Sequence, residues 1–211
     1  GECIYQSVED KKIVLENVMK AAEGKLTVIA HVACNNTKDS QELARHAESL
    51  GVDAIAAIPP IYFHLPEYAI AQYWNDISAA APNTDFVIYN IPQLAGVALT
   101  MNLFAEMRKN PRVIGVKNSS MPVQDIQMFK AVAGEDYVIF NGPDEQFMSG
   151  RVIGAEGAIG GTYGVIKAML KINEGLELGG VREPLPALIE SDMAIVEEAA
   201  KMVRDAKEKF L

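Results

Sequence analysis

The chain has 211 residues and a formal net charge of −9, and 49% of its residues are apolar and 22% charged. A chain of this length can bury a sizeable core and is predicted to form one domain. The acidic balance argues against nucleic-acid binding, because no basic stripe is present to neutralise phosphate groups. The acidic residues are spread over predicted helix faces, as is typical of a solvated surface.

Neither a metal site nor a membrane anchor is indicated by the sequence. Cys3 and Cys34 lack the spacing of a CxxC or zinc-binding motif, and the three histidines are scattered. No apolar run is long enough to span a bilayer. Free thiols, with no signal peptide and no membrane span, predict a cytoplasmic protein that binds no metal and no membrane.

Short, β-branched and nearly continuously apolar runs alternate with helical patterns up to residue 161. Such runs are typical of parallel strands that are covered on both faces. The six predicted strands are TVIAHVA (27–33), AIAAIPP (54–60), DFVIYNI (85–91), VIGVKNS (113–119), YVIFNG (137–142) and GAIGG (157–161).

Amphipathic segments fill most of the gaps between these strands. They are KKIVLENVMKAAEG (11–24), SQELARHAESLG (40–51), EYAIAQYWNDISAAA (67–81) and TMNLFAEMRKN (100–110). Strand ends recur every 25 to 31 residues, which is the length of a strand plus a crossover helix and indicates a parallel sheet. No GxGxxG follows any strand, so nothing favours a dinucleotide-binding fold. Reactive residues at several strand ends instead favour a TIM (β/α)8 barrel.

The strand signal stops after residue 164. Two helices are predicted in IKAMLKINEGLEL (166–178) and SDMAIVEEAAKMVRDAKEKF (191–210). We therefore expect a barrel portion at 1–164 that carries the active site, and C-terminal helices at 165–211 packed on it. Six predicted strands fall short of the eight of a closed barrel, which indicates either a truncated protein or segments missing from the sequence.

Lys117 stands at the inner end of an apolar strand, where a lysine is unusual. Desolvation there would lower its pKa and supply the neutral amine that attacks a ketone to form a Schiff base. The alternative is a strand-end lysine that points to solvent. Tyr89 ends the strand one βα unit earlier, so the two strands are expected to be neighbours. Its phenol can relay protons, although a strand tyrosine is more often part of the core.

Two further groups of residues follow strands. Asp144 and Glu145 can accept hydrogen bonds from the hydroxyls of a polyol, or they can simply open the next helix. Gly160, Gly161 and Thr162 allow close approach of a substrate to the backbone, or serve a tight turn. His31 lies inside an apolar strand and is predicted to be a core histidine whose ring is fully hydrogen-bonded.

Several motifs together resemble the N-acetylneuraminate lyase family, in the superfamily that includes dihydrodipicolinate synthase. The matching stretches are YNIPQLAGV (89–97), GVKNSS (115–120), NGPDEQ (141–146), GAIGGTYG (157–164) and residues 29–63. The resemblance implies that Lys117 forms the imine with pyruvate and that Tyr89 is the proton shuttle. It also implies that Ser119 lines the aldehyde side, and that Gly142, Asp144 and Glu145 contact the glycerol tail of sialic acid.

Departures from the family pattern refine these expectations. Dihydrodipicolinate synthases usually carry a carboxylate-binding arginine where this chain has Leu94, and an acidic pair suits hydroxyls, so a sugar acid is favoured. Gly161 replaces a serine that often contributes to the tail-binding site. The family motif GSTGE binds the pyruvate carboxylate, and only its last two letters match Gly1-Glu2. Strands one and two and a late helical segment are therefore expected to be missing.

The resemblance implies reversible cleavage of N-acetylneuraminate to N-acetylmannosamine and pyruvate in a homotetramer. No cofactor is implied, because the lysine itself supplies the electrophile. One alternative is a pyruvate-dependent aldolase for a 2-keto-3-deoxy sugar acid. The other is a non-catalytic barrel fragment that lacks the carboxylate site.

Overall fold

A computed structural model of the chain describes residues 2–161 and 163–210, which fall into two compact units. One unit comprises residues 6–160, and the other comprises residues 1–5 and 161–211. No helix among these residues is long and apolar enough to cross a membrane.

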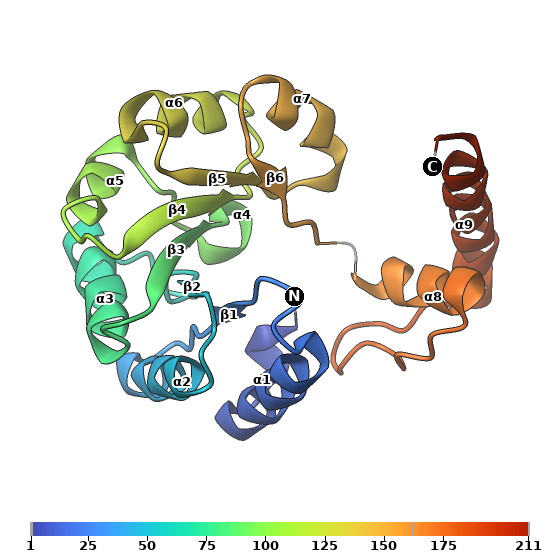
Figure 1. Cartoon of the computed structure of the whole chain (residues 1–211), viewed down its shortest axis with the longest axis horizontal. Helices are drawn as coiled ribbons and strands as arrows, with labels where there is room; N and C mark the ends of the chain where they lie inside the picture. The colour runs from blue at the N-terminus through green and yellow to red at the C-terminus, as the bar shows by residue number, and fades with distance from the viewer. Residues whose placement is uncertain (1, 162, 211) are drawn as a thin grey trace. The chain divides into compact units, whose positions relative to one another are not determined.

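The larger unit is built on a parallel sheet of six strands that follow one another in chain order (Figure 1). The strands are β1 (Ile29–His31), β2 (Ala54–Ala57), β3 (Asp85–Asn90), β4 (Val113–Asn118), β5 (Val138–Asn141) and β6 (Gly157–Ala158). Each lies inside a predicted strand. A doubly wound sheet reverses its strand order at a switch point, whereas this order never reverses, as in a barrel. The structure thus confirms the parallel α/β class; an eight-stranded closed barrel stays a prediction.

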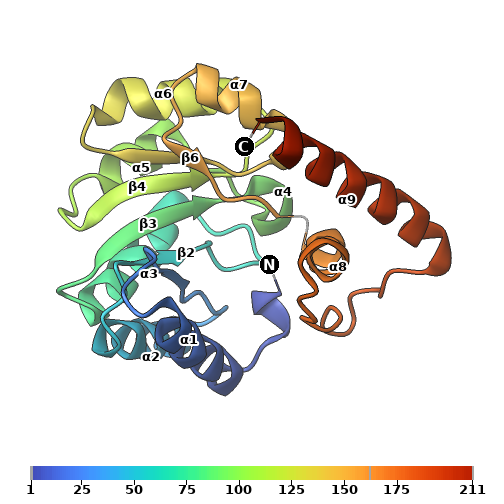
Figure 2. The same ribbon diagram turned by 45° about the vertical axis from the view of Figure 1, so that its right-hand side comes forward.

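Helix α1 (Val8–Ala22) precedes the first strand, and the other helices of this unit follow strands. They are α2 (Thr37–Ser49), α3 (Glu67–Ala80), α4 (Pro92–Ala95), α5 (Met101–Met107), α6 (Gln124–Ala133) and α7 (Phe147–Val152), with the 3-10 turn η2 (Asp144–Gln146). The longer helices lie along the outer side of the curved sheet, whereas the short α4 lies beside the ends of β3 and β4 (Figures 1 and 2). The helices α4, α6 and α7 were not predicted. Local sequence signals set both ends of α2. Asn36 caps its amino end, and Gly51, two residues after its last residue, adopts φ +73°.

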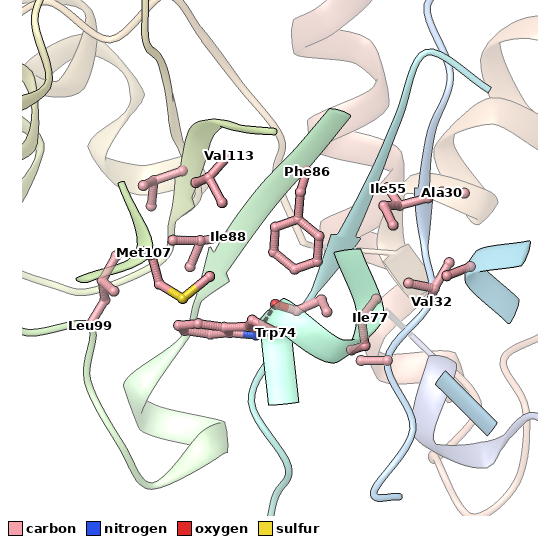
Figure 3. Packing of buried hydrophobic residues seen from close by; sticks show 14 of the residues in the cluster. Ala30, Val32, Ile55, Trp74, Ile77, Phe86, Ile88, Leu99, Met107 and Val113 are labelled. Carbon is pink, nitrogen blue, oxygen red and sulfur yellow. Dashed lines mark hydrogen bonds between the residues drawn. The ribbon is translucent and has the colours of Figure 1, made fainter. Parts of the chain in front are cut away.

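The main core lies between the sheet and these outer helices (Figure 3). Trp74 of α3 is 1% exposed, and its indole N–H donates to the carbonyl of Ala57 at 3.1 Å. This bond ties α3 to the end of β2 while the ring fills the core. The opposite face of the sheet carries a smaller cluster of Ala54, Ala56 and Val87.

The smaller unit contains α8 (Tyr163–Glu174), α9 (Glu190–Phe210) and the 3-10 turn η1 (Cys3–Tyr5). The Asn173 side chain donates to the carbonyl of Ala200 at 3.0 Å, which joins the two long helices. Both predicted C-terminal helices are therefore confirmed. The larger unit ends at residue 160, whereas the sequence predicts a boundary after residue 164. Packing of these helices on the barrel stays a prediction.

Candidate active site

Lys117 and Tyr89 lie side by side near the carboxyl ends of β4 and β3. The two residues are directly paired in the strand register, and the Lys117 Nζ lies 3.9 Å from the centre of the Tyr89 ring. An ammonium over a ring face at this distance makes a favourable cation–π contact. Lys117 is only 7% exposed, so the alternative of a lysine that points to solvent does not hold.

The alternation of side chains along the strands explains this placement. Ile88 and Val116 belong to the core under the outer helices, so their neighbours Tyr89 and Lys117 face the other side of the sheet. Val87 lies on that other side in the small cluster. A shift in the register between Phe86 and Val87 offsets the two strands ahead of the pair. The two reactive side chains therefore meet at one edge.

His31, at the end of β1, contacts the ring of Tyr89. Its ring meets the Tyr89 ring edge-on at 5.8 Å between centres. Burial, together with the nearby ammonium groups of Lys11 and Lys117, lowers the pKa of His31 from 6.5 to about 3. The neutral ring accepts the backbone N–H of Ile58 at Nε2, at 3.3 Å, and so carries its proton on Nδ1. That atom is buried and has no partner among the described residues, so the predicted fully hydrogen-bonded ring is wrong.

Ser119 and Gly142 come together where β4 and β5 end. Ser119 is half-buried, and Gly142 is buried. A Cβ at residue 142 would lie 2.0 Å from the Ser119 Oγ and 2.8 Å from the Asn118 carbonyl oxygen. Only glycine fits this contact. The sequence predicts Gly142 as a contact for the substrate, and close packing of the strand ends gives a second reason for the residue.

The acidic pair follows β5. Asp144 and Glu145 are exposed and form the first turn of η2, so they do open a helical segment as the alternative reading expected. Asp144 also reaches the end of β6, because a Cβ at Gly160 would lie 1.7 Å from its Oδ1. A carboxylate that is both exposed and anchored beside the strand ends remains suited to bind hydroxyl groups.

Gly161 is exposed and belongs to the smaller unit, and Thr162 lies outside the described residues. The role of Gly161 in the site stays a prediction. Within the ranges 2–161 and 163–210, no group of three His, Cys, Asp or Glu side chains could hold a metal ion. Cys3 and Cys34 are free thiols, as predicted.

The sequence reasoning missed a set of buried polar residues beside the pair. Asn90 and Asn118 come directly after Tyr89 and Lys117, and Asn141 ends β5 in the same register. All three are at most 3% exposed. The repeated asparagine after an apolar run is a visible signal, although a single strand-end asparagine looks like an ordinary turn residue.

Comparisons with known proteins agree with this geometry. An N-acetylneuraminate lyase of Mediterraneibacter gnavus is 74% identical, over all of this chain and 81% of the relative. Its alignment runs over 255 residues, more than the 211 of this chain, so the relative carries residues without a counterpart here. An N-acetylneuraminate lyase of Escherichia coli is 36% identical, over 79% of this chain and 56% of the relative.

Solved structures are also similar. The wild-type sialic acid aldolase of Ruminococcus gnavus superposes with a TM-score of 0.95 at 73% identity, over 100% of this chain and 85% of that one. A form of that aldolase with its catalytic lysine mutated gives a TM-score of 0.96 at 73% identity, over 100% of this chain and 84% of that one.

The fold and the site define a barrel-type parallel α/β protein with a buried lysine and a tyrosine at its strand ends. The profile of the dihydrodipicolinate synthetase family matches residues 1–199. The chain belongs to this family.

We expect His31 to make the stability of the protein depend on pH. The unfolded ring takes up a proton near pH 6.5, whereas the folded ring does so only near pH 3. Its contribution is therefore complete above pH 6.5 and is lost as the pH falls towards 3. Between pH 7 and pH 5 the wild type should lose about 2 kcal/mol more unfolding free energy than His31→Gln. Urea titrations at both pH values measure this, and equal losses would contradict it.

Proposed function

We propose that this chain catalyses the reversible cleavage of N-acetylneuraminate to N-acetylmannosamine and pyruvate. The observation that carries the proposal is the Lys117 Nζ 3.9 Å from the Tyr89 ring centre, at neighbouring strand ends. Barrel enzymes of this type place their chemistry at these ends. The relatives named N-acetylneuraminate lyase and sialic acid aldolase, one of them with a catalytic lysine, support the same reaction.

In the proposed cleavage, Lys117 acts as the nucleophile. Its neutral amine adds to the C2 ketone of the open-chain sugar acid, and loss of water from the carbinolamine gives a protonated imine. The imine draws electrons from the bond between C3 and C4, which breaks to give an aldehyde and an enamine. Protonation of the enamine at C3 and hydrolysis of the imine then release pyruvate and restore the amine.

Tyr89 is the proposed proton carrier. Tyr89 is proposed to give its phenol proton to the carbinolamine hydroxyl, which leaves as water, and then to take the proton of the C4 hydroxyl group as the bond to C3 breaks. In the direction of synthesis the same group returns the proton to the aldehyde oxygen. His31 contacts the Tyr89 ring edge-on and is neutral, so it adds no positive charge next to the phenol.

The acidic pair is the proposed contact for the glycerol tail of the sugar. The exposed Asp144 and Glu145 offer carboxylate oxygens to hydroxyl groups, with Ser119 on the aldehyde side and Gly142 at the backbone. Gly161 is proposed to complete this region. No organic cofactor or metal is needed in the proposal, because the imine itself serves as the electron sink.

Two alternatives remain open to test. A pyruvate-dependent aldolase for a 2-keto-3-deoxy sugar acid would use the same imine without the tail contacts. A non-catalytic fragment would lack turnover, since the serine and threonine that the family resemblance assigns to the pyruvate carboxylate are not in the sequence of this chain. Intact mass above 22.9 kDa for the cellular protein would show that it is longer than this chain.

Reduction with borohydride tests the proposed imine. With pyruvate present, we expect one adduct, which peptide mass mapping assigns to Lys117. Lys117→Arg should give no adduct and no turnover, because the guanidinium group stays protonated and cannot add to a ketone. Lys11→Arg is the matched control and should still be labelled at Lys117. A fully active protein without an adduct on Lys117 would refute the mechanism.

Substitution of Glu145 tests the choice of substrate. Glu145→Gln removes a carboxylate that is proposed to bind only the distal hydroxyls, so kcat/KM for N-acetylneuraminate should fall about tenfold. The value for a short 2-keto-3-deoxy acid should stay close to that of the wild type. An equal loss on both substrates would place Glu145 at the reacting centre instead, and a higher activity on the short acid would favour the alternative aldolase.

The proposed assembly is a cytoplasmic homotetramer, by resemblance to the family. Tyr62, Phe63 and Tyr68 are 85%, 70% and 79% exposed and line a cavity of about 1020 Å³ beside α3. An exposed cluster of large aromatic side chains is typical of a surface that another protein covers.

Sedimentation velocity tests this assembly. The wild type should sediment as a tetramer, and the double variant Tyr62→Ala, Phe63→Ala should shift towards smaller species because it removes two aromatic contacts. Leu26→Ala, at a 69% exposed residue of the loop before β1, is the control and should leave the assembly unchanged. A monomeric wild type would exclude the tetramer.

A further inference from the structure

A line of hydrogen-bonded polar side chains joins the ends of β3 and β4 to the start of α6. The Asn90 amide donates to the Asn118 Oδ1 at 2.7 Å, and the Asn118 amide donates to the Ser120 Oγ at 2.8 Å. The Ser120 hydroxyl donates to the Asp125 Oδ2 at 2.6 Å. The first three residues are at most 3% exposed, so the line is protected from water until it reaches Asp125.

Every bond in this line points the same way. The backbone N–H of Leu99 donates to the Asn90 Oδ1 at 2.9 Å, so the orientation of that amide is fixed at its start. The carboxylate of Asp125 can only accept when ionised, so the orientation is fixed at the end as well. Hydrogen bonds that share one direction polarise one another and hold each member in a single rotamer.

The two asparagines of this line are the sequence neighbours of the reacting pair. Asn90 follows Tyr89, and Asn118 follows Lys117. Each asparagine side chain points to the opposite face of the sheet from the residue before it. The backbones at the ends of β3 and β4 are also hydrogen-bonded to each other, because the Ser119 N–H donates to the Asn90 carbonyl at 2.7 Å. Movement of the asparagine amides would therefore shift the backbone that carries Tyr89 and Lys117.

An apolar side chain at residue 90 or 118 would pack in the core at least as well as asparagine does. Along β3 and β4 the earlier residues on this face are Phe86, Ile88, Val113 and Val116, all in the main core. On this face, polar side chains replace apolar ones only at Asn90 and Asn118, which follow Tyr89 and Lys117. A buried polar network costs free energy unless every member is satisfied, so its location beside the pair calls for a reason other than stability.

We propose that Asn90, Asn118, Ser120 and Asp125 form a positioning network that sets the distance between the Lys117 amine and the Tyr89 phenol. The inference rests on the proposed function and adds to it residues that touch neither the substrate nor the reacting atoms. Loss of one link lets the ends of β3 and β4 move relative to each other. A shift of this kind in a reacting pair lowers the rate of the chemical step more than it changes substrate binding.

The test compares two buried serines that each accept a hydrogen bond from an asparagine amide. Ser120 is 3% exposed and accepts from Asn118, and Ser78 is 2% exposed and accepts from Asn110 at 3.1 Å, just before β4 begins. We expect Ser120→Ala and Ser78→Ala to lower Tm by a similar few degrees, about 2–8 °C. Only Ser120→Ala should lower kcat and the rate of borohydride trapping with pyruvate, by about tenfold, with little change in KM.

Two further variants keep the test decisive if Ser120→Ala folds poorly. Ser120→Thr retains the hydroxyl group and should recover most of the lost kcat. Asp125→Ala removes only the last acceptor, at the half-buried start of α6, and should also lower kcat. If kcat of Ser120→Ala and Asp125→Ala stays within about twofold of Ser78→Ala, the positioning network is refuted while the imine stands. If the wild type gives no adduct on Lys117, the proposed function fails and this inference fails with it.

Discussion

The contact between an ammonium group and a phenol ring across two parallel strands organises the rest of the site. Lys117 and Tyr89 meet because β3 and β4 run in the same direction, and because the register pairs these residues directly. In a parallel sheet all strands end at one edge, so the predicted site residues at strand ends, and in the loops after them, lie along the same edge as this pair. The buried asparagines, the neutral histidine and the glycine at residue 142 are all arranged around this one contact.

The chemical type of the side chain at the carboxyl edge of the sheet differs from one strand to the next. An uncharged imidazole ends β1, a phenol and an amine follow on β3 and β4, and two carboxylates stand after β5. Under the proposed reaction, the keto acid would sit over the amine and the hydroxyl-rich end of the sugar would extend towards the carboxylates. The low pKa of His31 matters in this arrangement, because a second cation beside Tyr89 would repel the ammonium of Lys117.

Patterns within a single strand and the order of neighbouring strands could be predicted, whereas the register between strands could not. All six strands, and the adjacency of the strands that carry Tyr89 and Lys117, followed from apolar runs spaced by crossover helices, but the direct pairing of the two residues did not. Helix α6 was missed, and the bonds of Asn118 to Asn90 and Ser120 need a register that no local pattern contains. His31 was predicted to be fully hydrogen-bonded. Whether its Nδ1 finds a partner depends on the elements that pack around it, and none of the described residues provides one.

The tight approach of Gly142 to Ser119 limits how the specificity of this chain can change over evolution or in the laboratory. A side chain at residue 142 would collide with the backbone at the end of β4, whereas one at residue 160 would meet only the exposed carboxylate of Asp144, which can move aside. Residue 142 is therefore the position closed to sequence variation. New substrate ranges must instead arise at Glu145, which is exposed, and at the loops beyond it. A combinatorial library would gain most if it kept Gly142 fixed and randomised the acidic turn.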